Sequence, residues 1–202
     1  MKLGIFGGTF DPIHSGHILP VRRARDVLGL DRVYYLPTAR PPHKPGRQFV
    51  RSQRRFAMAE LALLDEVDFE VSAWELTPGE FAFTVDTVER FHRREPTDEL
   101  CVILGGDSFK QLTTWKRWRD IVRIASLAVL TRPGWDYKSV EQSLPEELRD
   151  LVTAGKVTFV RNDPVETSST ELRHLFRTGS DIPANAMPEL VVQYIRKYSL
   201  YK

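Results

Sequence analysis

Short apolar runs alternate with amphipathic stretches along the 202 residues, and this alternation limits the folds open to the chain. The runs predict strands at residues 3–6, 33–36, 69–72, 100–104, 127–131 and 157–160. The amphipathic stretches predict helices at residues 16–28, 52–64, 84–93, 145–152, 169–176 and 188–198. Strands that alternate with helices form parallel sheets covered by helices. The expected fold is α/β, a Rossmann-like doubly wound parallel sheet, in a single domain over residues 1–202.

Composition excludes several classes of function. The formal net charge of +2 is too small to indicate a nucleic-acid partner. No apolar stretch approaches the roughly 18 residues that cross a bilayer, so no membrane association is expected. The apolar start, residues 1–7, is too short for a secretory signal. We therefore expect a cytoplasmic protein.

The single cysteine, Cys101, lies inside an apolar run. One cysteine cannot form an intramolecular disulfide, and no cysteine-rich metal site is possible. Cys101 is therefore expected to be a small buried side chain.

The segment from Gly7 to His17 follows the first predicted strand directly and reads Gly-Gly-Thr-Phe-Asp-Pro-Ile-His-Ser-Gly-His. Glycines let a backbone turn sharply and approach a ligand closely. A helix start offers unpaired N–H groups to anions, and two imidazoles add donors. The segment lacks the ending of a Walker A loop and the glycine spacing of a dinucleotide fingerprint. Two histidines are too few for a metal site. The chemistry indicated is phosphate handling.

Two further loops follow predicted strands directly. Gly105-Gly106-Asp107 comes after one buried strand, and Arg132-Pro133-Gly134 comes after the next. Ligands of open α/β sheets bind beyond the carboxyl ends of the strands, where the strand order reverses. These loops are therefore expected to open onto the same edge as the segment from Gly7 to His17.

The segment from Gly7 to His17 resembles the phosphate-binding signature of the nucleotidylyltransferase α/β-phosphodiesterase superfamily. Its fuller string is similar to that of bacterial nicotinate-nucleotide adenylyltransferases. Six further segments resemble the same family. In order along the chain they are Pro41-Pro42-His43-Lys44, Arg55-Phe56-Ala57-Met58, Ala82-Phe83-Thr84-Val85-Asp86-Thr87, Gly105-Gly106-Asp107-Ser108, Arg132-Pro133-Gly134-Trp135 and Ser168-Ser169-Thr170-Glu171-Leu172-Arg173. The last matching positions, Leu200 and Tyr201, are assigned to packing only.

The resemblance implies a fold of the nucleotidylyltransferase type and a role for each matching residue. His14 and His17 would be catalytic. The residues implied to bind ATP and its phosphates are Gly7, Gly8, Thr9, Phe10, Lys44, Gly105, Asp107, Ser168, Ser169, Thr170 and Arg173. The residues implied to bind nicotinate mononucleotide are His43, Arg55, Thr84, Trp115 and Arg132.

Some positions depart from the family pattern or have a simpler explanation. Phe83, Lys116 and Trp135 each stand where the family usually has Tyr. Ser168 with Glu171 fits a capping box, which is compatible with phosphate binding. Asp107 and Thr84 could likewise serve as helix caps.

The implied reaction is attack by the 5′-phosphate of nicotinate mononucleotide on the α-phosphorus of ATP, with release of pyrophosphate. Mg²⁺ is expected to accompany ATP, bound by phosphate oxygens and water rather than by protein ligands. Two alternatives stay open: a phosphopantetheine adenylyltransferase-like enzyme, and a catalytically silent nucleotide-binding regulator. The sequence leaves the oligomeric state open.

Overall fold

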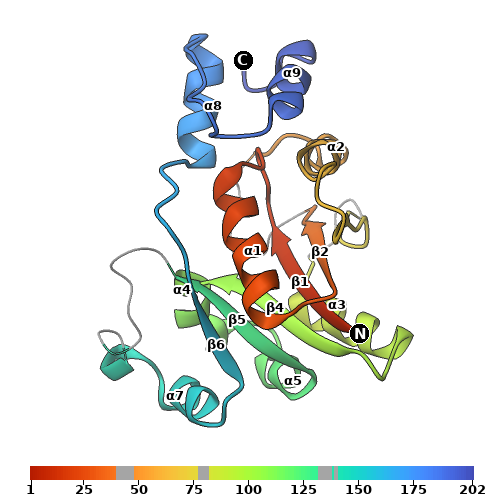
Figure 1. Ribbon diagram of the computed structural model, residues 1–202, viewed down its shortest axis with the longest axis vertical. Helices are drawn as coiled ribbons and strands as arrows, with labels where there is room; N and C mark the ends of the chain where they lie inside the picture. The colour runs from red at the N-terminus through yellow and green to blue at the C-terminus, as the bar shows by residue number, and fades with distance from the viewer. Residues whose placement is uncertain (40–47, 77–81, 132–137, 139–140) are drawn as a thin grey trace. The chain divides into compact units, whose positions relative to one another are not determined.

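The computed structural model describes residues 1–39, 48–76, 82–131, 138 and 141–202. Six strands of this described part form one sheet in the order β3-β2-β1-β4-β5-β6 (Figure 1). Their bounds are β1 Lys2–Gly8, β2 Arg32–Pro37, β3 Phe69–Val71, β4 Glu99–Gly105, β5 Ala125–Thr131 and β6 Val157–Arg161. This order is that of a doubly wound sheet, with its reversal between β1 and β4. The predicted fold class and all six predicted strands are confirmed.

The described helices connect the strands or follow them. They are α1 Ser15–Leu28, α2 Ser52–Ala62, α3 Thr84–Arg94, α4 Gly106–Lys110, α5 Trp118–Ile124, α7 Glu146–Thr153, α8 Ser169–Thr178 and α9 Glu189–Lys197, with 3-10 turns η1 Leu112–Thr114 and η2 Glu141–Ser143. The sequence pattern missed α4, η1 and α5. These elements are three to seven residues long, too short to show a helical period.

The chain divides into two compact units. The first contains residues 1–7, 20–34 and 83–164, and the second contains residues 8–19, 35–82 and 165–202. The expectation of a single domain stays a prediction.

The core of the first unit surrounds β4. This strand pairs in parallel with β1 and with β5, and β5 pairs in parallel with β6. All five residues from Leu100 to Leu104 are at most 5% exposed, as expected for a strand covered on both faces. Cys101 is one of them, which confirms the prediction that it is buried. Helix α3 turns Val85, Val88 and Phe91 inward at helical spacing.

Helices α2, α8 and α9 contribute buried side chains to the core of the second unit. Helix α2 buries Met58 and Ala59, and α2 contacts α9. Helix α8 buries Leu172 and Phe176, and it ends at Gly179, whose φ of +71° is the left-handed conformation typical of a C-cap glycine. The start of α8 carries part of the candidate site.

No helix in the described part of the chain is both long enough and apolar enough to cross a bilayer.

Candidate functional site

The loop after β1 makes a tight turn in the second unit. A Cβ on Gly8 would lie 2.5 Å from the ring atom Cε1 of Phe10, so this position has no room for a side chain. Phe10 has a φ of +48°, which is uncommon for a residue other than glycine. Its ring is 1% exposed and meets the His17 ring edge-on at 5.3 Å. Phe10 therefore supports the histidine from inside the unit.

His14 and His17 form a pair at the start of α1. Their ring centroids are 3.9 Å apart. The backbone N–H of Gly16 donates to Nδ1 of His14 at 3.1 Å, and the backbone N–H of His14 donates to Nδ1 of His17 at 3.3 Å. A neutral imidazole whose Nδ1 accepts a hydrogen bond carries its proton on Nε2. Both rings are thus oriented by the backbone, with Nε2 as the N–H donor.

Gly16 is required between the two histidines. A Cβ at this position would lie 2.8 Å from Cε1 of His14, closer than side chains approach one another. The glycine of the His-Ser-Gly-His string therefore leaves room for the His14 ring.

Helix α8 holds the loop from the other side. Its N-cap Ser168 accepts a hydrogen bond from the backbone N–H of Glu171, as the capping-box pattern predicts. The hydroxyl of Ser169 donates to the carbonyl oxygen of Pro12 at 3.0 Å. The guanidinium of Arg173 donates to the carbonyl oxygen of Asp11 at 2.6 Å. Ser169 and Arg173, which are predicted to bind phosphate, thus contact the histidine loop, the segment from Gly8 to His17.

A cavity of about 680 Å³ opens beside this helix start. It is lined by Gln48, Ser168, Thr170, Glu171, Arg173, His174 and Arg177. Three of these residues were predicted to bind ATP phosphates. The motifs did not indicate Gln48, His174 or Arg177 as lining residues. Arg173 and Arg177 are four residues apart and are therefore neighbours on one helix face.

Arg55 is almost completely buried beneath the loop, with 1% exposure. Its guanidinium donates to four backbone carbonyl oxygens, those of Val50 at 2.8 Å, Thr9 at 2.5 Å, Thr38 at 2.8 Å and Ala39 at 3.3 Å. Burial lowers the pKa of Arg55, and the nearby Asp11 carboxylate opposes that shift. The sequence predicted this residue to bind nicotinate mononucleotide. That role stays a prediction, and the geometry adds a structural one.

The first unit contains the loop after β4. Gly105 ends this strand and is the N-cap of α4, and Asp107 lies exposed in the first turn of the helix. The N-cap position is taken by Gly105 and Asp107 lies two residues inside the helix, so Asp107 is not the helix cap. A Cβ on Gly105 would meet no described atom within 4 Å, so packing does not require the glycine.

Thr84 and Trp115 also belong to the first unit. Thr84 is the first residue of α3, whose N-cap is Phe83 without a side-chain hydrogen bond, so Thr84 is not the cap either. Trp115 follows η1, and its neighbour Lys116 forms an ion pair with Asp86 of α3 at 3.2 Å. Lys116 therefore connects the Trp115 turn to the start of α3.

The predicted residues fall into three groups. The second unit brings together Gly8, Thr9, Phe10, His14, His17, Arg55, Ser168, Ser169, Thr170 and Arg173, whereas Gly7, Thr84, Gly105, Asp107 and Trp115 belong to the first unit. His43, Lys44 and Arg132 lie outside the described residues. Over the part of the chain that is described, no group of three or more His, Cys, Asp or Glu side chains could hold a metal ion.

Comparison with known proteins yields consistent matches. A family model described as cytidylyltransferase-like matches residues 5–175. A protein of Aeromonas hydrophila is 40% identical over 99% of this chain and 97% of its own length, and one of Solibacter usitatus is 39% identical over the full length of both. Both carry the name "Probable nicotinate-nucleotide adenylyltransferase".

The similarity extends to solved structures. The Plasmodium falciparum nicotinic acid mononucleotide adenylyltransferase, complexed with NaAD, has a TM-score of 0.78 and 17% identity. The match covers 99% of this chain and 97% of that one. At this identity the likeness shows that the two proteins share a fold.

Proposed function

This chain belongs to the nicotinate-nucleotide adenylyltransferase family, and from that premise we propose how its residues carry out the transfer. The 5′-phosphate oxygen of nicotinate mononucleotide forms a bond to the α-phosphorus of ATP. The bond from that phosphorus to the oxygen bridging the α- and β-phosphates breaks. The products are nicotinate adenine dinucleotide and pyrophosphate, and the reaction is a step of NAD biosynthesis.

The histidine pair carries this proposal. The nucleophile is already an anion, so the site needs no strong base and no covalent intermediate. It needs alignment and donors directed at the charge on the α-phosphoryl group. His14 and His17 supply two such donors, because backbone N–H groups occupy Nδ1 of both rings. We assign the stabilisation of the transferred phosphoryl group to their Nε2 atoms.

The phosphates of ATP are assigned to the residues around the 680 Å³ cavity. Ser168 and Thr170 line this cavity and offer hydroxyl groups, and Ser169 between them offers its backbone N–H. Arg173 offers a guanidinium whose planar donors suit phosphate. The backbone from Gly7 to Phe10 contributes amides on the loop. Lys44, Gly105 and Asp107 are assigned to ATP through the motifs alone.

The acceptor nucleotide is assigned to Thr84 and Trp115, with His43, Arg55 and Arg132 as further contacts. The indole of Trp115 would stack on the pyridine ring. For Arg55 the four hydrogen bonds to backbone carbonyls support an additional role, in which it holds the loop that contains Thr9.

Mg²⁺ is proposed to enter with ATP. Magnesium prefers oxygen ligands and keeps several waters, so phosphate oxygens can provide most of its coordination. When bound, the ion would neutralise phosphate charge.

The test measures pyrophosphate release from Mg-ATP with nicotinate mononucleotide, nicotinamide mononucleotide or phosphopantetheine as acceptor. Activity with nicotinate mononucleotide is expected. Activity with phosphopantetheine alone would select the alternative enzyme, and ATP binding without pyrophosphate release would select the regulator.

The variant His17→Ala tests the residue assignment. We expect its turnover to fall by about 100-fold or more, the loss typical of a donor to a developing charge, while its circular dichroism stays unchanged. His92 is an exposed histidine of α3 and provides the matched control. His92→Ala is expected to keep normal turnover, and normal turnover of His17→Ala would refute the assignment.

A further inference from the structure

The side chain of Tyr201, the second-last residue of the sequence, contacts the histidine loop. Its hydroxyl donates to Oδ1 of Asp11 at 2.8 Å, across 190 positions of sequence. Asp11 is 5% exposed and precedes His14 by three residues. The family resemblance assigns Tyr201 to packing alone. The hydrogen bond to Asp11 is therefore an observation that the resemblance did not supply.

The backbone around Tyr201 is unusual. After α9 the chain turns back, and both Ser199 and Tyr201 have positive φ, at +50° and +71°. The backbone N–H of Leu200 donates to the carbonyl oxygen of Ile195 at 3.0 Å. Left-handed conformations of residues other than glycine persist only where the surroundings enforce them. The backbone hydrogen bonds of this turn and the contacts of the Tyr201 side chain are interactions that can do so.

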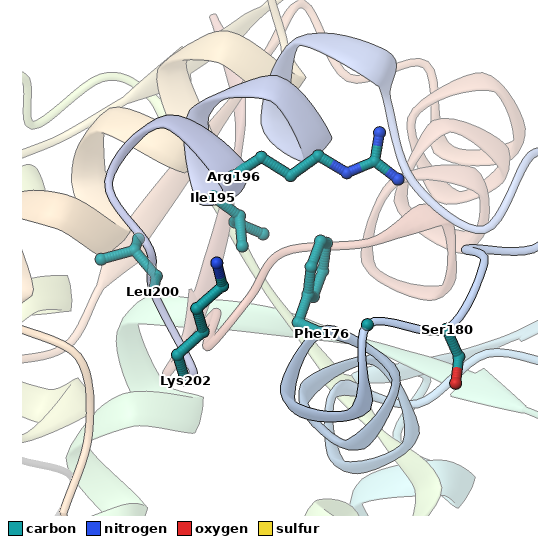
Figure 2. Close-up of a pocket in the computed structure, with 7 residues that line it drawn as sticks. Phe176, Ser180, Ile195, Arg196, Leu200 and Lys202 are labelled. Atoms are coloured by element: carbon teal, nitrogen blue, oxygen red, sulfur yellow. The ribbon is translucent and has the colours of Figure 1, made fainter.

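This segment borders a cavity. A cavity of about 170 Å³ lies between α8, α9 and residues 200–202 (Figure 2). Leu200 and Lys202, the neighbours of Tyr201 on either side, line it together with Phe176 and Ile195. In Figure 2 the Lys202 side chain points toward Ile195 across this space. The directed contacts of Tyr201 therefore carry more of the positioning than they would in a filled core.

Those contacts are the hydrogen bond to Asp11 and a ring contact. The Tyr201 ring lies 6.2 Å from the Phe176 ring of α8. Burial raises the pKa of the Tyr201 hydroxyl, and the neighbouring Asp11 carboxylate raises it further, so the group stays protonated and remains a donor. Without this donor, a buried carboxylate oxygen would lose its hydrogen bond.

We propose that Tyr201 is a positioning residue for the histidine pair, acting through Asp11. The hydroxyl holds the Asp11 side chain, while Arg173 and Ser169 hold the carbonyl oxygens of Asp11 and Pro12. Three hydrogen bonds thus hold Asp11 and Pro12, which lie three and two positions before His14. The effect on catalysis rests on the proposed function, but the effect on the histidines does not.

The test compares Tyr201→Phe with Tyr198→Phe. The first removes only the hydroxyl that contacts Asp11, and the second removes the hydroxyl of an exposed ring three residues away. We expect kcat of Tyr201→Phe to fall about tenfold, because small displacements of reacting groups slow transfer steeply, with KM for nicotinate mononucleotide unchanged. Tyr198→Phe is expected to match the wild type.

A second readout does not depend on activity. The imidazole NMR signals of His14 and His17 in the ligand-free protein, assigned with single histidine variants, should shift in Tyr201→Phe and not in Tyr198→Phe. A double-mutant cycle then tests whether Tyr201 acts through Asp11. In the Asp11→Ala background, Tyr201→Phe should change kcat less than about twofold, because the partner is already gone.

Unshifted imidazole signals in Tyr201→Phe, or an unchanged kcat, would overturn the proposal. So would a full tenfold loss in the Asp11→Ala background. A wild-type protein that releases no pyrophosphate would instead refute the proposed function, and the imidazole signals would still decide whether Tyr201 positions the histidines.

Discussion

The ammonium group of Lys116 lies 4.3 Å from the centroid of the Phe83 ring. By the family resemblance both residues stand in place of Tyr, and the two departures contact each other. The contact places a cation over an aromatic face, which is favourable. The same ammonium group pairs with Asp86 at 3.2 Å. Phe83 directly precedes Thr84 and Lys116 directly follows Trp115, so the contact lies beside two residues that are predicted to bind the acceptor.

We predict that Lys116→Ala weakens the acceptor site without disturbing the reaction itself. The Lys116 and Asp86 side chains are 44% and 51% exposed, so their ion pair is weak. We therefore expect only about a threefold rise in KM for nicotinate mononucleotide, with kcat unchanged. Steady-state kinetics measure both. Lys110→Ala, a change at an exposed lysine of α4, is the control. A large fall in kcat would contradict the prediction.

The two loop glycines are expected to respond differently to alanine. In Gly8→Ala the new Cβ would lie 2.5 Å from a buried Phe10 ring, and the free energy of unfolding should fall by about 1–3 kcal/mol. In Gly7→Ala the Cβ would meet no described atom within 4 Å. That variant should be unchanged or up to about 1 kcal/mol more stable. Urea denaturation compares the two, and equal losses would show that Phe10 does not restrict the position.

Arg55→Met should destabilise the protein strongly. Methionine fills similar space but leaves four carbonyl oxygens without their donor, so we expect a loss of about 3 kcal/mol or more in the free energy of unfolding. The exposed Arg51, four residues earlier, provides the control, and Arg51→Gln should change stability by less than about 0.5 kcal/mol. A loss for Arg55→Met as small as the control's would mean that these hydrogen bonds do not stabilise the loop.

Cys101 should react slowly with thiol reagents while the protein is folded. Burial raises the pKa of its thiol above the ordinary value of 9.0, and the thiolate is the reactive form. Because the folded pKa is the higher one, the stability contribution of the neutral thiol is complete below pH 9 and is lost as the pH rises through the folded pKa. Labelling with a chromogenic disulfide at pH 8, with and without denaturant, checks the rate. Rapid labelling of the native protein would be the contrary result.

The sequence by itself determined the features that depend on local pattern. Strand and helix periods, the predicted burial of Cys101 and the cap at Ser168 are each encoded within a few residues, and each is confirmed. The site segments were also found as local strings. Short helices such as α4 and α5 were not predicted, because fewer than eight residues do not display a helical period of apolar residues.

Only the tertiary structure decided how those strings are held. Arg55 reaches Thr9 across 46 positions, and Tyr201 reaches Asp11 across 190. A hydrogen bond between residues so far apart leaves no local signal, because either side chain could as well face solvent. The string from Gly7 to His17 predicts phosphate chemistry, but its geometry depends on Arg55, Arg173 and Tyr201, which the fold brings to the loop.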